Sequence, residues 1–479
     1  MTEAGNNYSE KKTQLHISVR NLVEFIFREG DIDNRSSRAM SADAMMEGTR
    51  IHRKIQGSMG KEYQAEVPLS LVVEGDLYEL TVEGRADGIF TEDGKCFVDE
   101  IKGMYRRVEL FEKPVFVHRA QAMCYAYIFA LQNNMETIGI QMTYCNLETE
   151  QIKYFREEFS FEEIKKWFDD LMEEYGKWAT FQCEMKNQRQ ASIKELDFPY
   201  EYRPGQKKLV SDVYRTIMRQ KLLFMQAPTG VGKTISTIFP AVKAVGEELA
   251  DRIFYLTAKT ITATVAKETF ALLEKNGYRA KTIQITAKEK LCPCDEMECN
   301  PVTCPYAKGH FDRVNDAVFD LLHRCEMIER DDILSQADRY TVCPFELCLD
   351  TASWCDNIIC DYNYVFDPNV YLKRFFQEGI KGDYIFLIDE AHNMVERSRQ
   401  MYSAQIYKED FLTVKRIMKE HSRSIEKALE KCNKILLGMK RECENYTVYD
   451  TFGNMVFSFM RLMTLLDAVS YTHLTLPTI

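Results

Sequence analysis

The nonapeptide QAPTGVGKT, residues 226–234, constrains the fold of this chain more than any other feature. It follows the apolar run KLLFM and precedes the helical stretch ISTIFPAVKAV. A glycine-rich loop between a buried strand and a helix can cradle phosphates with its backbone N–H groups, and the helix N-terminus adds its positive dipole end. The glycines Gly230 and Gly232 would shape this loop. Lys233 would reach the β- and γ-phosphates of ATP, and Thr234 would hold Mg²⁺ through its hydroxyl.

The stretch YIFLIDEAHN supplies the expected partner of that loop. Its apolar residues Tyr384–Ile388 predict a buried strand, and two carboxylates follow at the C-terminal end. Asp389 suits Mg²⁺ binding, and Glu390 suits orienting and polarising an attacking water. With the runs RIFYLTA and KLLFMQ, the strand belongs to a β-α-β pattern that predicts a parallel sheet and an α/β fold.

Composition limits the possible classes of protein only broadly. Hydrophobic residues make up 45% of the 479-residue chain and the net charge is −11. No apolar stretch is long enough for a membrane span, and the N-terminus has no apolar core typical of a signal peptide. We therefore expect a cytoplasmic protein without a membrane partner. The acidic total does not exclude nucleic acid, because a local basic or aromatic groove is sufficient.

Cysteine is distributed unevenly, with nine of fifteen residues between Cys292 and Cys360. The densest part, KEKLCPCDEMECNPVTCPYAKG, is polar, which does not suit small core side chains. A reducing cytoplasm argues against disulfides. A zinc site, an iron–sulfur cluster and unliganded thiols all remain possible from the spacing alone.

A second group of polar residues lies near the N-terminus, in VEGRADGIF and FVDEIKG. Alternation places Glu100 and Lys102 on one face of a strand, and Asp87 lies on the neighbouring strand beyond the hairpin TEDGK. Two carboxylates can hold one or two Mg²⁺ or Mn²⁺ ions, which lower the pKa of a bound water. Taken alone, this pattern is more often a solvated sheet edge than an active site.

These residues resemble the PD-(D/E)xK nuclease superfamily, and more closely its RecB-like branch. In EGTRIH, His52 stands where that branch has an extra metal ligand. In QAMCY, Gln121 and Tyr125 match its QxxxY motif on one helix face. The resemblance implies a restriction-endonuclease-like α/β domain with an active site, although the proline of the signature is absent.

The nucleotide motifs resemble motifs I and II of superfamily 2 helicases, although Ala227 replaces the first glycine of the loop signature. YRPGQ resembles the stretch that recognises adenine, with Gln206 as the base contact, and FYLTAKT resembles the motif that touches single-stranded DNA. About 155 residues separate Lys233 from Asp389, and the cysteines lie in this insertion. The arrangement resembles the Rad3/XPD/DinG group, whose members unwind DNA 5′ to 3′.

In that group four cysteines bind a [4Fe–4S] cluster. The resemblance assigns this role to Cys292, Cys299, Cys304 and Cys343, with spacing C-x6-C-x4-C-x38-C. Cys294 could replace Cys292 or only flank it. Zinc stays open as an alternative, because Cys299 with Cys304 and Cys343 with Cys348 would form two x4 pairs.

The domain organisation follows from these motifs. We expect a nuclease domain over 1–185, a linker over 186–200, a RecA-like domain over 201–394 with an iron–sulfur insertion at about 286–360, and a partial helical arch over 395–467. Nothing after Asp389 resembles the second motor half, so we expect weak nucleotide binding and slow hydrolysis. Residues 468–479 contain no charged side chain and no continuing helical period, and we interpret them as a foreign tail.

The sequence thus predicts an ATP-dependent DNA helicase with a metal-dependent nuclease domain, acting on single-stranded or forked DNA in repair or recombination. One alternative is a degenerate nuclease fold that grips DNA without cutting it. Another is a zinc-stabilised, DNA-dependent ATPase that does not unwind.

Overall fold

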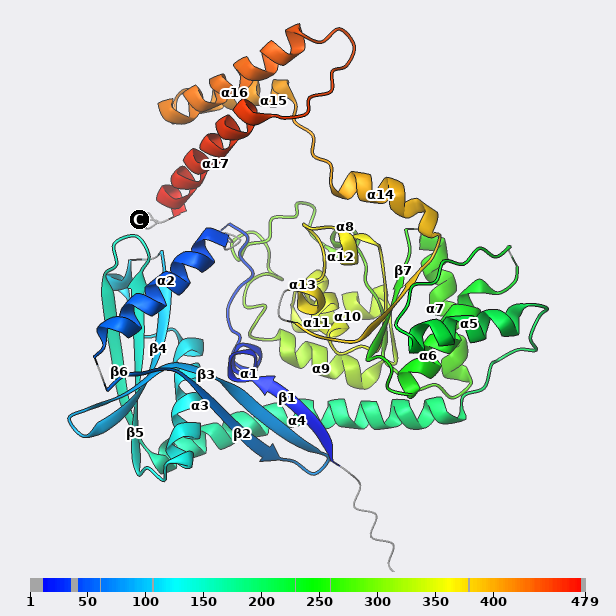
Figure 1. The fold of residues 1–479 in the computed structure, drawn as a ribbon, viewed down its shortest axis with the longest axis horizontal. Coiled ribbons are helices and arrows are strands. Elements are labelled where there is room, and N and C mark those ends of the chain that lie inside the picture. Colours follow the sequence, from blue (N-terminus) through cyan, green and yellow to red (C-terminus); the bar gives the residue numbers. More distant parts are fainter. Residues whose placement is uncertain are drawn as a thin grey trace, which may run out of the picture. The chain divides into compact units, whose positions relative to one another are not determined.

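The computed structural model describes residues 12–35, 42–60, 62–105, 107–228, 230–258, 260–377 and 380–474. They form two compact units (Figure 1). The first contains the N-terminal domain and the region from residue 201 to 392, which we call the motor region after its expected role. The second contains residues from 393 onward together with 366–369. Both sheets lie in the first unit and helices pack on them, so the predicted mixed α/β class is confirmed.

The N-terminal domain is built on a six-stranded mixed sheet of order β1-β3-β4-β5-β6, with β2 paired to β3. Its strands are β1 (Thr13–Ser18), β2 (Gln64–Glu74), β3 (Tyr78–Glu92), β4 (Lys95–Met104), β5 (Thr137–Asn146) and β6 (Ile152–Ser160). Its helices are α1 (Val19–Ile26), α2 (Ala42–Ser58), α3 (Phe116–Gln132) and α4 (Phe161–Glu195), with a short 3-10 turn, η1 (Val108–Leu110).

Strand β3 changes partners along its length. Its first part pairs in parallel with β1, from Tyr78 to Glu83, and its last part pairs antiparallel with β4, from Gly88 to Glu92. The β3–β4 hairpin turns through Asp93 and Gly94, both at positive φ, which fits the right-handed twist of the strands. Beyond Gly88 the two strands part, and this fork is where polar side chains can meet.

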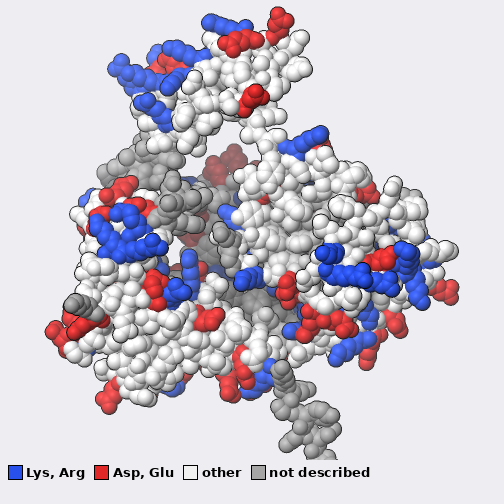
Figure 2. Space-filling view, in the orientation of Figure 1, with Lys and Arg blue, Asp and Glu red and all other residues white. Residues whose placement is uncertain are grey.

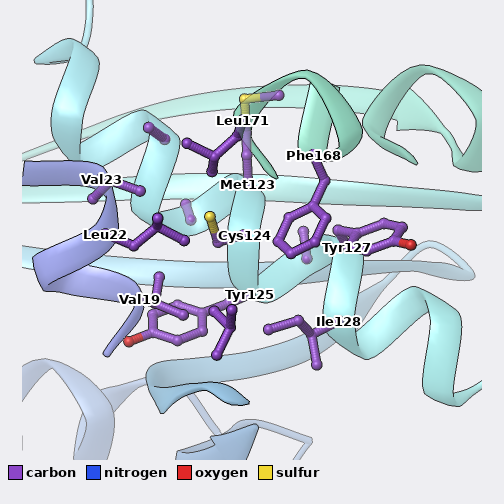
Figure 3. Close-up of a cluster of buried hydrophobic side chains, with 14 of the residues drawn as sticks. Val19, Leu22, Val23, Met123, Cys124, Tyr125, Tyr127, Ile128, Phe168 and Leu171 are labelled. Atoms are coloured by element: carbon purple, nitrogen blue, oxygen red, sulfur yellow. The ribbon is translucent and has the colours of Figure 1, made fainter. Parts of the chain in front are cut away.

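The core of the domain lies between the sheet and helices α1, α3 and α4 (Figure 3). Burial of these apolar side chains fixes α3 across the sheet, because removing their surface from water is the main favourable term in folding. The residues labelled in Figure 3 are Val19, Leu22, Val23, Met123, Cys124, Tyr125, Tyr127, Ile128, Phe168 and Leu171.

Helix α4 differs from the sequence prediction. We expected a linker over 186–200, but the helix continues to Glu195 and joins the N-terminal domain to the motor region (Figure 1). Its polar C-terminal part is ordered by two buried residues. Arg189 forms an ion pair with Asp356, and Ile193 packs in the motor core beside Gly246.

Replacing Ile193 tests whether this segment is structural. The side chain is 2% exposed, and truncating such a residue to alanine typically costs about 2–4 kcal/mol. We therefore expect Ile193→Ala to lower the free energy of unfolding by about that amount in urea denaturation. Lys194→Ala, a change at the exposed neighbouring position, is the matched control. Equal stability of the two variants would show that the segment behaves as a linker.

The motor region has a five-stranded, all-parallel sheet of order β11-β7-β10-β8-β9. Its strands are β7 (Arg252–Leu256), β8 (Thr282–Gln284), β9 (Met327–Ile328), β10 (Asn357–Cys360) and β11 (Tyr384–Ile388). Its helices are α5 (Gln206–Met218), α6 (Lys233–Gly246), α7 (Thr260–Lys275), α8 (Lys288–Leu291), α9 (Val314–Arg324), α10 (Arg330–Tyr340), α11 (Pro344–Ala352), α12 (Asn363–Phe366) and α13 (Lys373–Phe376), followed by the 3-10 turn η2 (Ala391–Asn393).

The prediction of a strand just before the phosphate loop is wrong. Residues 221–225 adopt no regular secondary structure, and Leu222 and Phe224 are each 89% exposed. A strand requires a neighbour to satisfy its backbone groups, and this run pairs with none. Strand β11 therefore forms the edge of the sheet, and its Phe386 is 40% exposed. The predicted strands RIFYLTA and DYIFLI do form, as β7 and β11.

The second unit is helical, as predicted for the segment 395–467. It contains α14 (Met394–Met401), α15 (Lys408–Met418), α16 (Arg423–Arg441) and α17 (Gly453–Leu474). A small core joins α15, α16 and α17 through residues such as Phe411, Leu429 and Leu462. Helix α17 continues to Leu474, so the expected end of helical structure near 468 is wrong, and residues 475–479 lie outside the described part.

Charge is mixed on the molecular surface. Figure 2 shows basic and acidic side chains interspersed on the face in view, in keeping with a net charge of −11. Among the described helices, none is long and apolar enough to cross a membrane. The sequence analysis expected no membrane partner; the lengths of the described helices do not test that expectation further.

Candidate active sites

The fork between β3 and β4 brings the predicted carboxylates together. Asp87 lies on β3 just before the paired segment, and its Oδ2 accepts a hydrogen bond of 2.7 Å from the backbone N–H of Ile101. Glu100 and Lys102 lie on one face of β4, with Lys102 Nζ 2.6 Å from Glu100 Oε1. The hydrogen bond from Ile101 to Asp87 thus joins β3 and β4 at the point where their backbone pairing ends.

Helices α2 and α3 complete this group. His52 on α2 places Nδ1 3.6 Å from Asp87 Oδ1, and Gln121 on α3 places Oε1 3.3 Å from Lys102 Nζ. Tyr125 lies one turn after Gln121 and approaches β3 so closely that a Cβ at Gly84 would be 2.5 Å from its hydroxyl. All six polar residues singled out in the N-terminal sequence therefore converge on one place.

Burial governs the electrostatics of this group. Glu100 is 1% exposed, and desolvation, with a smaller contribution from the charge of Asp87, raises its pKa to about 8. Its Oε2 is buried without a hydrogen-bond partner. For His52, burial lowers the pKa, but the hydrogen bond and charge of Asp87 outweigh it, so the net shift is upward. A buried carboxylate with an unsatisfied oxygen beside a second carboxylate has the chemistry of a divalent-cation site.

The nucleotide motifs also meet in space. Helix α6 begins at Lys233, directly after Gly230 and Gly232, which both adopt positive φ. Lys233 Nζ lies 3.8 Å from Glu390 Oε1 at the end of β11. Glu390 itself has φ +50, a sparsely populated conformation for a residue with a side chain. Thr229 of this loop and Lys259 of FYLTAKT lie outside the described residues.

Gln206 occupies a different environment from the expected base contact. It is 3% exposed; its side-chain amide nitrogen donates to Ser236 Oγ at 3.1 Å, and its carbonyl oxygen accepts from the Arg203 N–H at 3.0 Å. A Cβ on Gly232 would lie 2.8 Å from its Nε2. Gln206 therefore supports the phosphate loop here, and contact with adenine would require these bonds to exchange.

Two tyrosines that sequence reasoning missed border Thr234 and Asp389, the residues expected to bind Mg²⁺. Tyr255 on β7 interacts with Thr234 and Asp389, and burial, with the charge of Asp389, raises its pKa. The hydroxyl of Tyr362 donates to the backbone carbonyl of Asp389. Tyr255 lies in the stretch FYLTAKT and Tyr362 in the stretch DYNYVF, but nothing in the spacing of these residues indicates these contacts.

The cysteine-rich insertion encloses a small cavity. Its lining includes Cys292, Cys299, Cys304 and Cys343, the four thiols expected to bind a cluster, and it does not include Cys294. Burial raises the pKa of the Cys343 thiol to about 11. The cavity measures about 20 Å³, room for one water, so a cluster would displace side chains that now fill it. The donor set itself fits, because four thiolates are the common ligands of such clusters.

The remaining cysteines distinguish between the alternatives. All fifteen are free thiols, so no disulfide framework is present. Cys348 does not line the cavity; it is fully buried, near the carbonyl of Gln284. This position argues against the zinc pair of Cys343 with Cys348. Cys294 Sγ lies 3.9 Å from Cys304 Sγ, at the margin of the site. Within the described ranges, no three His, Cys, Asp or Glu side chains already have metal-binding geometry.

Comparison with known proteins identifies the motor region. The family model DEAD_2 matches residues 271–411, which contain the whole cysteine insertion and the DEAH stretch. The rat "Regulator of telomere elongation helicase 1" is 20% identical over 248 residues, covering 42% of this chain and 19% of the relative. The yeast "General transcription and DNA repair factor IIH helicase subunit XPD/RAD3" is 24% identical over 232 residues, covering 41% and 29%. The motor region is of the DinG/XPD helicase type.

This DinG/XPD-type assignment concerns part of the chain. The chain spans less than a third of the length of these two relatives. A solved structure named "Truncated XPD" has a TM-score of 0.35 at 15% identity, covering 56% of this chain and 76% of that one. The family match does not include the N-terminal domain, so the nuclease-like site is argued from its own residues.

Proposed function

We propose that this chain carries the ATP-binding part of a 5′–3′ DNA helicase, fused to a metal-dependent DNA nuclease domain. The observation that carries the motor proposal is the approach of Lys233 to Glu390, with Thr234 and Asp389 joined through Tyr255. Lys233 would bind the β- and γ-phosphates, Glu390 would orient the attacking water, and Mg²⁺ would be held by Thr234 and Asp389. Single-stranded or forked DNA is the proposed substrate, in repair or recombination.

Nucleotide binding tests the motor proposal directly. We expect Lys233→Ala to weaken the binding of a fluorescent ATP analogue by about tenfold or more, because a charge-assisted contact to phosphate is worth roughly 1.5–3 kcal/mol. Lys275→Ala, an exposed position at the end of α7, is the matched control and should bind as the unmodified chain does. Equal affinity of both variants would contradict the assignment of Lys233.

The nuclease proposal rests on the convergence of six polar residues at the fork of the N-terminal sheet. Asp87 and Glu100, with His52, would hold Mg²⁺ or Mn²⁺. The bound metal would lower the pKa of a water molecule. Lys102, held by Glu100 and Gln121, would position that water or stabilise the charge that develops on the phosphate. Tyr125 approaches Gly84 of β3 from the same helix as Gln121, and the two residues would together orient Lys102.

A domain that binds DNA without cutting it is the competing function for this site. The two proposals differ in one measurement, the degradation of end-labelled single-stranded DNA with Mg²⁺ or Mn²⁺. Cleavage that stops in EDTA supports the nuclease. If the labelled DNA stays intact but is bound by the protein in a mobility-shift assay, the result would instead support the DNA-binding alternative.

For the cysteine insertion we propose a [4Fe–4S] cluster bound by Cys292, Cys299, Cys304 and Cys343. What supports it is that these four thiols line one cavity in a DinG/XPD-type motor, with Lys288 beside Cys299. A colourless protein with stoichiometric zinc would favour the alternative of a zinc-stabilised ATPase.

A further inference from the structure

The segment that follows helix α1 runs beside the cysteine insertion (Figure 1). We call Gly30–Asn34 the strap. Its backbone exchanges hydrogen bonds with a loop nearly 280 residues later in the sequence. The Ile32 N–H donates to the carbonyl of Ala307 at 2.9 Å, and the Asn34 N–H donates to the carbonyl of Cys299 at 2.9 Å. The strap therefore pairs with the cysteine loop at Cys299, an expected cluster ligand, and at Ala307, three residues after the expected ligand Cys304.

Side chains reinforce this pairing at the start of the strap. The Gly30 N–H donates to Asp312 Oδ1 at 2.7 Å, and Asp31 Oδ1 accepts from the Gly309 N–H at 2.6 Å. Just before the strap, Arg28 binds Asp350 of α11 at 2.9 Å. The strap donates in some of these contacts and accepts in others. It is therefore held to the cysteine insertion at several points.

The strap also forms part of the cavity wall. Ile32 lines the same cavity as Cys299 and Cys304, and among the residues that the structure describes it is the one lining residue from the N-terminal domain. Its apolar side chain forms the wall of the cavity on that side. An apolar wall limits access of water and of water-borne reagents to a thiol site.

A relay of contacts links the strap to the distant fourth ligand. The carbonyl of Gly30 accepts a hydrogen bond of 3.0 Å from the N–H of Phe311, the residue that follows His310. His310 is fully buried, and its Nδ1 accepts a hydrogen bond of 3.1 Å from the backbone N–H of Cys343. Helix α11 begins directly after Cys343, and Arg28 binds that helix through Asp350.

We propose that the strap is a working part of the cysteine site: it positions the loops that carry Cys299, Cys304 and Cys343 and shields their thiols from solvent. The N-terminal domain thus protects the metal-binding part of the motor region. Protection of a cluster by the strap rests on the proposed [4Fe–4S] cluster, whereas shielding of the thiols by the strap does not.

Thiol reactivity in the full chain tests the shielding. The reduced, metal-free protein is alkylated with iodoacetamide, and each cysteine is followed over time by peptide mass spectrometry. We expect Ile32→Ser to accelerate alkylation of Cys299 and Cys304 several-fold, with the rate at Cys443 unchanged as an internal reference. The matched control is Ile152→Ser, the same change at an exposed position on β6.

The possible outcomes distinguish the proposal that the strap shields the thiols from the proposal that the thiols bind a cluster. Equal alkylation rates in Ile32→Ser and Ile152→Ser would overturn the proposal. If the protein never takes up iron and sulfide but Ile32→Ser still exposes these thiols, the cluster proposal fails and the shielding stands. If a cluster is incorporated, its iron should pass to a chelator faster in Ile32→Ser than in the control.

Hydrogen exchange on the unmodified chain provides a test that needs no variant. The amides of Ile32 and Asn34 should exchange slowly in comparison with amides of exposed turns, because both donate to carbonyls of the cysteine loop. Exchange of both amides at the rate of an open chain would show that the strap is not held against the site, and would contradict the proposal.

Discussion

Asp87→Asn is expected to lower metal-dependent cleavage of single-stranded DNA by about 100-fold or more, since a catalytic metal contributes several kcal/mol and each 1.36 kcal/mol is a factor of ten. The amide has the shape of the carboxylate and can still accept the hydrogen bond from the Ile101 N–H. The fold should therefore persist while the affinity for the cation falls. The measurement is the initial rate of release of labelled nucleotides at saturating Mg²⁺ or Mn²⁺.

Asp76→Asn provides the control for this result. Asp76 is exposed in the turn between β2 and β3, on the same domain, and its replacement makes the same chemical change. It should cleave at the unmodified rate. Full activity in Asp87→Asn would contradict the assignment of the β3–β4 fork as the catalytic site. Loss of activity in both variants would show that the effect of Asp87→Asn is not specific to the fork.

Cys343→Ser is expected to abolish the brown colour of the anaerobically reconstituted protein, together with its bound iron and sulfide. Cys343 is separated from the other three expected ligands by 38 residues or more of sequence, yet it lines the same cavity. Serine keeps the size of the side chain but is a poor ligand for iron. Visible absorbance, with iron and sulfide analysis on the same samples, measures the loss.

Cys294→Ser is the matched comparison within the same loop. Cys294 does not line the cavity, although its sulfur lies 3.9 Å from that of Cys304. We expect its replacement to leave the colour and the iron content unchanged. A colourless Cys294→Ser beside a coloured Cys343→Ser would reverse the ligand assignment.

The parts of the structure that the sequence predicted are those set by local pattern. Strand β11 is formed by Tyr384–Ile388, as its apolar run indicates, and Glu100 and Lys102 share a face of β4 because side chains alternate along a strand. Gln121 and Tyr125 lie one helical turn apart. Placing His52 beside Asp87 required the family resemblance as well, because no local pattern joins α2 to β3.

The parts that the sequence did not predict depend on partners far along the chain. Within the polar end of α4, only Arg189 and Ile193 are buried after residue 185, too few to show a helical stripe. The strap has no periodic pattern, and its partners lie nearly 280 residues away. The run at 221–225 has the composition of a strand, but a strand also needs a neighbour, which composition cannot supply.

Because α4 is one continuous helix, the number of residues between two of its contacts with the motor region fixes how those contacts are rotated relative to each other. Its 35 residues correspond to a rod of about 52 Å at 1.5 Å per residue. Trp178 packs on Phe319 and Trp354 of the motor region, and Ile193 packs on Gly246 further along. Inserting or deleting a single residue between them would rotate one contact by about 100° relative to the other. The exposed side of this helix should therefore tolerate substitutions, whereas its length between the two contacts should tolerate changes only in steps close to whole turns.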